Sequence, residues 1–148
     1  MTSFTSRYGD LAVDEQGAHA WAYCRHAATV VAISGRIDAA NAESLTGYAL
    51  RFVTADRPFV LDLTGSTSLT PGAARLLTGV ADRCAAAGTA WALVAGESAN
   101  QLLTDALDAA ELAEMPLVGT LAEAEHQFDE AILGRRRALL SLVGKKTA

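Results

Sequence analysis

Short apolar segments alternate with longer amphipathic segments from residue 29 onward, and this alternation constrains the fold more than any other feature of the sequence. The apolar segments cover residues 29–34, 59–63, 90–95 and 115–118, and most are rich in strand-forming residues. The segments between them space their apolar residues three and four positions apart, as helices do. Strands that are joined through helices run parallel, with right-handed crossovers. We therefore predict an α/β fold with a mostly parallel sheet.

A hairpin is expected before the alternating region. Residues 20–26 (AWAYCRH) form a strand pattern, and only Ala27 and Ala28 separate them from the next strand. The complete order becomes β-β-α-β-α-β-α-β-α, a single domain with a mixed, mostly parallel sheet and an antiparallel N-terminal hairpin. We expect a flexible segment at 1–18, the domain at 19–133, and a basic, leucine-containing extension at 134–148.

Several residues are expected to begin or end the helices. Asp38 or Asn41 can cap the first helix, and Gly88 can end the second. We expect two capping boxes to begin the later helices. Ser98 with Gln101 begins a helix that runs to residue 110, and Thr120 with Glu123 begins the last helix. Within the sheet, we expect residues 59–63 to be central and residues 115–118 to be marginal.

Charge is distributed unevenly along the chain. Residues 1–130 hold 7 basic and 17 acidic side chains, whereas residues 131–148 hold 5 basic side chains and no acidic one. An acidic body argues against nucleic-acid binding. The basic end is either a solvated helix terminus or a phosphate-binding patch. No apolar run is long enough for membrane insertion, no signal peptide is recognisable, and the two cysteines are expected to be buried free thiols, so we expect a cytoplasmic protein.

Catalytic and metal-binding patterns are not found in the sequence. It contains no glycine-rich phosphate loop, and His19, His26 and His126 show no metal-ligand spacing. Asp62, inside an apolar strand, is either a catalytic carboxylate or an acceptor for loop amides. Ser98 follows Gly-Glu but lacks the second glycine of a nucleophile elbow. We therefore expect neither an enzyme nor a cofactor.

Hydroxyl groups are concentrated at residues 66–72, between a strand and a helix. Such a loop can carry a catalyst, a phosphorylation switch or a helix cap. Thr70 fits a cap, and Pro71 fits the first helical position. A second cluster, at the N-terminus, is either an ordinary tail or a regulatory phosphorylation site; its members are Thr2, Ser3, Thr5 and Ser6.

Two motifs, in this order, resemble those of the STAS domain family. The first is Gly-Arg-Ile-Asp-Ala-Ala-Asn-Ala at residues 35–42, and the second is Asp-Leu-Thr-Gly at residues 62–65. The resemblance covers about residues 20–130. It implies an anti-sigma factor antagonist, which binds an anti-sigma factor, often a serine kinase, and so frees a sigma factor. Other members are stress-sensing scaffolds, parts of anion transporters, or partners of lipid-transport ATPases.

The family's phosphorylation switch is altered in this sequence. Relatives carry Asp-Ser-Ser-Gly at the start of the second helix and are phosphorylated on a serine there. In one alignment the acceptor position holds Gly72, and in the other it holds Pro71. Thr70 is the nearest hydroxyl and the one phosphorylation candidate in this segment. We therefore predict partner binding without the usual switch; the alternative is a non-switching scaffold or a transporter-associated partner protein.

The predicted partner-binding surface combines three segments that parallel strands should bring together. It comprises the turn after the second strand, the hydroxyl-rich segment, and the exposed side of the second helix. Its residues are Gly35, Asp38, Ser66, Thr67, Ser68, Thr70, Gly72 and Arg75.

The C-terminal extension is expected to add a helical stretch. Leu139, Leu140, Leu142 and Val143 follow three arginines, and a row of exposed leucines is costly. We expect this stretch to begin at a break near Gly134 and to pack on the body or on a partner, and a homo-oligomer is possible.

Overall fold

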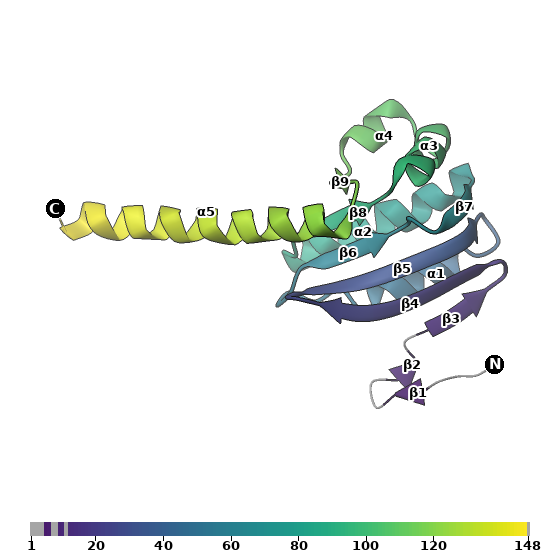
Figure 1. Cartoon of the computed structure of the whole chain (residues 1–148), viewed down its shortest axis with the longest axis horizontal. Coiled ribbons are helices and arrows are strands. Elements are labelled where there is room, and N and C mark those ends of the chain that lie inside the picture. The colour runs from purple at the N-terminus through teal and green to yellow at the C-terminus, as the bar shows by residue number, and fades with distance from the viewer. Residues whose placement is uncertain (1–4, 7–8, 11, 148) are drawn as a thin grey trace.

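The computed structural model describes residues 5–6, 9–10 and 12–147, and its larger sheet has the order β3-β4-β5-β6-β8-β9, with β7 also paired to β5. Figure 1 shows this twisted sheet with helices on both sides. The strands of this sheet are β3 Ala12–Glu15, β4 Ala18–Arg25, β5 Ala28–Ile37, β6 Phe59–Asp62, β7 Ser66–Leu69, β8 Trp91–Val94 and β9 Leu117–Val118. A separate small sheet pairs β1 Thr5–Ser6 with β2 Gly9–Asp10.

The predicted fold class is confirmed. Strands β4 and β5 form an antiparallel hairpin, and β5, β6, β8 and β9 pair in parallel. Strand β6 lies between β5 and β8, whereas β9 is a two-residue strand at the edge, as expected for residues 59–63 and 115–118. The apolar residues of β5 and β6 are buried because helices cover both sheet faces.

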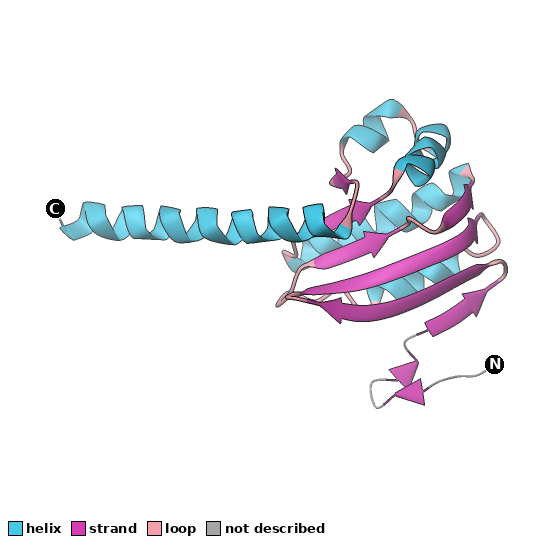
Figure 2. Ribbon diagram, viewed as in Figure 1, coloured by secondary structure: helices cyan, strands magenta, loops and turns pink. Residues whose placement is uncertain are grey.

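Two apolar layers hold the helices on the sheet. On one face, Leu45 of α1, Leu76 of α2 and Leu103 of α3 share a core with Ile33 and Leu61. On the other face, Ala124 and Phe128 of α5 cover Val30 and Val60. The helices, shown in cyan in Figure 2, are α1 Ala42–Leu50, α2 Ala74–Ala87, α3 Glu97–Ala106, α4 Ala109–Ala113 and α5 Leu121–Thr147, with a 3-10 turn, η1, at Pro71–Ala73.

The structure contains elements that the predicted order lacks, including the short strands β1 and β2. Strand β3 pairs antiparallel with β4, although no strand was expected before residue 20. The segment expected as a hydroxyl-rich loop is strand β7, because β5 extends beyond β6 and offers it free backbone groups to pair with. Helix α3 ends at Ala106, and the separate helix α4 follows, begun by a capping box of Asp108 and Glu111.

The predicted helix starts are only partly correct. Gly88 ends α2 in the left-handed conformation, as expected. Thr120 Oγ1 accepts a hydrogen bond from the Glu123 amide, but the Glu123 carboxylate accepts from Gly119 rather than closing the box. Ser98 lies inside α3, whose N-cap position is Gly96, so the capping box expected there is wrong.

Helix α5 is continuous where a break was expected. It runs through Gly134 to Thr147, and its second half projects from the body (Figure 1). The exposed fraction of its large apolar side chains rises from 38% at Ile132 to 70% at Leu140, so the described part of the extension does not pack on the body. Thr2 and Ser3 of the N-terminal hydroxyl cluster lie outside the described residues.

Candidate functional site

The carboxyl end of β5 and the start of α2 meet at one end of the sheet. Strand β7 pairs in parallel with the end of β5, placing Ser66 beside Gly35 and Leu69 beside Ile37. The Thr70 amide then donates to the Ile37 carbonyl oxygen across 3.1 Å. The three segments expected to form the partner-binding surface are therefore adjacent.

Gly35 lets β5 pass from one pairing partner to the next. Its φ is +92°, and a Cβ there would overlap the Gly17 carbonyl oxygen. The register of the β5–β7 pairing shifts between Gly35 and Arg36. The Arg36 amide, in turn, donates to the Gly17 oxygen across 2.9 Å. A residue with a side chain could not occupy this position without displacing the β3–β4 turn.

Asn41 fixes the turn that follows β5, although it was expected to cap a helix. Its Nδ2 donates to the carbonyl oxygens of Glu15, Gln16 and Arg36, at 3.0, 3.3 and 2.8 Å. Its Oδ1 accepts from the Asp38 amide across 3.0 Å. The side chain is almost fully buried and makes no cap bond to α1. Asn41 therefore ties the turn to the segment between β3 and β4.

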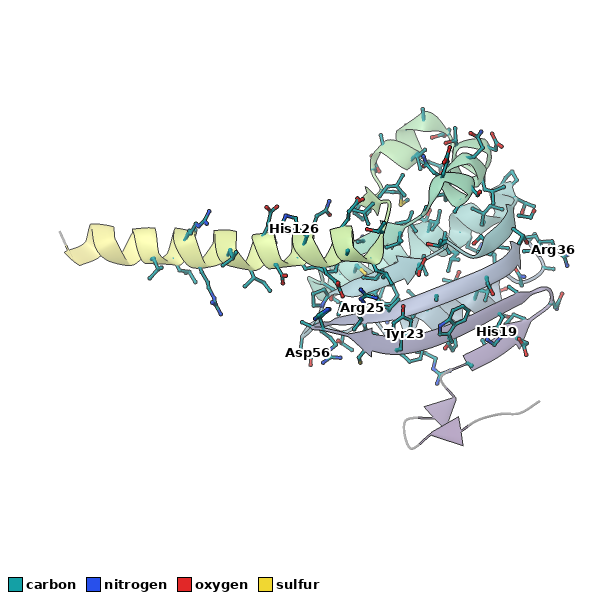
Figure 3. The ribbon with its side chains drawn as sticks, in the orientation of Figure 1. His19, Tyr23, Arg25, Arg36, Asp56 and His126 are labelled. Atoms are coloured by element: carbon teal, nitrogen blue, oxygen red, sulfur yellow. The ribbon has the colours of Figure 1, made fainter. Side chains whose placement is uncertain are left out.

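Arg36 and Asp38 form an ion pair on the turn after β5. Asp38 Oδ2 accepts a hydrogen bond from Arg36 Nε across 2.9 Å, and Asp38 Oδ1 accepts from the Ala40 amide across 2.9 Å. Asp38 thus shapes its own turn instead of capping α1. The Arg36 side chain is exposed, and Figure 3 shows it at the end of the sheet away from α5. Arg36 was not among the predicted site residues, although its position between Gly35 and Asp38 was a signal.

Gly72 packs the start of the second helix against this turn. A Cβ on Gly72 would lie 2.9 Å from the Ala39 nitrogen and 3.0 Å from the Ala39 Cα. Its small size therefore serves an internal contact. Thr70 is at the N-cap position of η1 but makes no side-chain cap bond, so its expected capping role is wrong. A cleft of about 280 Å³ lies between the turn and this helix start; its lining residues are Ala39, Ala42, Pro71, Gly72 and Arg75.

The hydroxyl groups of β7 and of Thr70, which follows it, differ in exposure. Thr67 is exposed, Ser68 and Thr70 are half-buried, and Ser66 is buried. Ser66 Oγ has no hydrogen-bond partner among the described residues. Arg75, on the first turn of α2, is exposed at the mouth of the cleft. Thr67, Ser68, Thr70 and Arg75 are therefore available to a partner, whereas Ser66 is not.

The three histidines do not share a centre. His19 lies 2.6 Å from Asp14, and His126 lies 3.2 Å from Glu130 of its own helix. His26 lies 3.6 Å from Glu125, on a third part of the surface. Among the residues that the structure describes, no three His, Cys, Asp or Glu side chains are grouped as a metal site. The same described residues include no helix that is long and apolar enough to cross a membrane.

Other candidate reactive groups have structural roles. Asp62 Oδ1 accepts from the amide and the hydroxyl of Thr64, which agrees with the interpretation of Asp62 as a turn acceptor. Burial raises the pKa of the Cys84 thiol to about 11, so this thiol is protonated at neutral pH. Cys24 is exposed, contrary to the expectation that both thiols are buried, and its Sγ accepts from Arg57 across 2.8 Å.

The chain matches one family model and is similar to several known proteins. The model of the STAS domain matches residues 20–125. Osmosensory protein A from Mycobacterium tuberculosis is 38% identical over 144 residues, which is 97% of this chain and 91% of that protein. An anti-sigma factor antagonist from Mycobacterium paratuberculosis is 26% identical, with a TM-score of 0.58, over 74% of this chain and 92% of that chain. A variant of RsbS from Moorella thermoacetica is 17% identical, with a TM-score of 0.60, over 76% of this chain and 97% of that chain, and shows the same fold.

Proposed function

Because the chain belongs to the STAS domain family, we propose that it acts by binding proteins and that its partner is an anti-sigma factor. A solved relative with 26% identity is an anti-sigma factor antagonist. In this proposal the chain regulates transcription in the cytoplasm by occupying the anti-sigma factor, which leaves a sigma factor free. It performs no catalysis and needs no cofactor.

One observation carries the proposal: the turn after β5 and the start of the second helix form a single exposed surface. The turn presents Arg36 and Asp38, and the helix start presents Thr70, Gly72 and Arg75 beside the cleft. Hydrogen bonds and close packing within the chain hold this surface in place before any partner arrives. A surface held in its bound shape loses little conformational entropy on association.

The proposed binding lacks the family's phosphorylation switch. Gly72 and Pro71, which occupy the acceptor position in the two alignments, cannot accept a phosphate. Thr70 remains the candidate hydroxyl, since it is half-buried and makes no cap bond. A phosphate on Thr70 would add about two negative charges to the surface and would disrupt a buried contact there. We therefore expect constitutive binding when the partner is an anti-sigma factor of the serine-kinase type.

The direct test is a binding measurement between the purified chain and the anti-sigma factors of its own genome. Arg75→Ala should weaken binding by about tenfold, because arginines are frequent hot spots at protein interfaces. Arg83→Ala is a matched control, since Arg83 is also exposed and lies two turns further along α2. Equal binding by both variants, or no binding to any anti-sigma factor, would contradict the proposal. Co-purification with a transport ATPase or a large STAS assembly would support the alternative, a scaffold or transporter partner.

Phosphorylation of Thr70 is tested separately. The complex is incubated with ATP, and modified residues are mapped by mass spectrometry. We expect no stoichiometric phosphate on Thr70. Phosphate on Thr70, with binding lost in Thr70→Glu and kept in Thr70→Val, would show a switch moved by one or two residues.

The proposed regulation of transcription also requires a stimulus. The 38% identical relative is named Osmosensory protein A, so we propose osmotic stress as the first stimulus to test. Osmotic upshift should change transcript levels of the sigma factor's genes in wild-type cells and leave them unchanged in cells that lack this chain.

A further inference from the structure

Large exposed apolar side chains are concentrated on α5. Among the residues that the structure describes, those exposed are Ile132, Leu133, Leu139 and Leu140. The first and third are seven positions apart, as are the second and fourth, so all four lie along one side of the helix. Within this apolar stripe, Ile132 still lines surface clefts beside Pro58 and Phe128, whereas Leu139 and Leu140 are 63% and 70% exposed on the part of α5 that projects from the body (Figure 1).

The projecting half of α5 would be more stable if another surface packed against it. About 15 residues of α5 extend past Ile132, and isolated helices of this size are only marginally stable in water. The extension also contains Gly134, which weakens a helix by about 1 kcal/mol relative to alanine. The first turns gain stability from Ala124 and Phe128, which pack on the sheet. A second surface that covers the stripe would do the same for the later turns.

Charge along α5 indicates what this second surface is. The acidic side chains occupy its first half, at Glu123, Glu125, Asp129 and Glu130, and the basic ones occupy its second half, at Arg135, Arg136, Arg137, Lys145 and Lys146. A parallel pair of such helices would place like charges together. An antiparallel pair would place the acidic half of each helix beside the basic half of the other. The helix is therefore complementary to itself in one orientation.

The outer side of α5 is open along both halves. Ala124 and Phe128 face the sheet, whereas His126 and Glu130 have side chains 72% and 67% exposed. His126 is labelled on the projecting helix in Figure 3. By helical periodicity, Leu133, Arg137 and Leu140 continue the side that carries His126 and Glu130. A second helix can therefore lie along this side without meeting the body that α5 covers.

We propose that two copies of this chain form a dimer through antiparallel pairing of their α5 helices. A twofold axis near Leu133 packs the two Leu133 side chains together, lays Leu140 along the first half of the partner's α5, and places Glu130 beside the partner's Arg136 or the partner's Arg137. The proposal does not depend on the proposed function, because the candidate partner-binding surface lies at the other end of the sheet (Figure 3).

Charge reversal in the full-length chain tests the dimer and its orientation together. Sedimentation equilibrium should show that wild-type protein dimerises. Asp129→Arg with Glu130→Arg should weaken the dimer by about tenfold or more, because each replacement turns two attractive pairs of a symmetric dimer into repulsive ones. Adding Arg136→Glu and Arg137→Glu to that variant should restore dimerisation. Asp82→Arg with Glu114→Arg, at exposed positions on α2 and just after α4, is the matched control and should leave the dimer unchanged.

Three outcomes would overturn the proposal. One is a wild-type chain that stays monomeric up to about 1 mM, the range in which weak association becomes detectable. Another is a dimer that the first charge reversal leaves intact, since that is expected of a parallel pair. The third is a dimer that persists in Leu133→Gln with Leu140→Gln. An unchanged melting temperature of the body in each variant verifies that the chain is folded.

Discussion

At one end of the sheet the chain is held by close internal contacts, whereas at the other end α5 runs outward with its leucines exposed (Figure 1). At the first end, Asn41 and Gly35 join the turn after β5 to the segment between β3 and β4. The second end offers an apolar stripe and a charge gradient. The difference indicates two modes of recognition: a preformed surface for one partner, and a helix whose later turns gain stability only when covered.

A glycine-to-alanine substitution at the closely packed end should give the largest effect on stability. Gly35→Ala places a Cβ against the Gly17 carbonyl oxygen at a φ of +92°, so we expect a loss of about 2–4 kcal/mol in the free energy of unfolding. Gly47→Ala is the control. Gly47 lies within α1 with no atom near its added Cβ, and alanine there should stabilise by about 0.5–1 kcal/mol. Urea unfolding measures both. Equal stability of the two variants would mean that the turn is not constrained as described.

The buried amide of Asn41 should give the next largest effect. Asn41→Ala removes donors to three carbonyl oxygens and leaves buried groups without partners, which should cost about 2–3 kcal/mol and loosen the candidate surface. Asn100→Ala makes the same replacement at an exposed position on α3 and should cost little. Hydrogen exchange should show faster exchange at residues 35–42 in the first variant only. If exchange there were unchanged, the amide would not be what holds the turn.

The scaffold could be predicted from the sequence because its signals are local. The apolar residues of β5, β6 and β8 are contiguous in sequence, and alternation with helices implies their parallel order. The proximity of the turn at 35–38 to residues 66–72 followed from that order alone. Strand β7 could not be predicted in this way, because Ser-Thr-Ser-Leu has no apolar alternation. It is a strand because β5 is long enough to pair with two successive strands.

The details of the site depend on contacts distant in sequence. Asn41 fits a helix cap in its local context, but its amide bonds to Glu15 and Gln16, some 25 residues earlier. The sequence places Gly72 on the partner-binding surface, but the atoms next to an added Cβ there belong to Ala39. Gly134 suggested a break, yet it lies among strong helix formers that carry α5 through it. In each case the sequence marks a special position, and the tertiary neighbour decides its role.

Removal of residues 135–148 should affect assembly while leaving the body intact. The described side chains in this segment are exposed, so we expect the free energy of unfolding of the body to change by less than about 0.5 kcal/mol. Sedimentation should nevertheless show loss of the dimer. Binding to the anti-sigma factor at the opposite end should be retained within about twofold, since distant sites usually act independently. A large fall in melting temperature at low protein concentration would show that the extension packs on the body after all.

Alkaline pH should act on the body and not on the extension. Burial raises the pKa of Cys84 to about 11 and that of Tyr48 to about 12, above their ordinary values of 9.0 and 10.0. The unfolded chain therefore releases these protons first. The contribution of these two protonated groups to the free energy of unfolding is fully present below about pH 9. It is lost as the pH rises through about 11 and 12. Urea midpoints at about pH 8 and about pH 10 should decrease equally in the full chain and in the chain without residues 135–148. A flat profile would contradict the burial of these groups.

The smallest effect is expected from Gly134→Ala, which changes the projecting half of α5. Gly134 is exposed, and nothing lies within 4 Å of an added Cβ, so the substitution introduces no clash. It should favour the helical state of α5 by up to about 1 kcal/mol and leave the unfolding of the body unchanged. If α5 frays in the monomer, circular dichroism at low concentration should show a small gain in helix content. The dimer should then tighten by up to about tenfold, because each of its two helices loses less freedom on pairing. No gain in helix content and no tighter dimerisation would mean that α5 is already fully formed in the monomer. A gain in helix content without tighter dimerisation would mean that the dimer does not form through α5. A weaker dimer would place Gly134 inside the contact, where its lack of a side chain allows the two helices to approach.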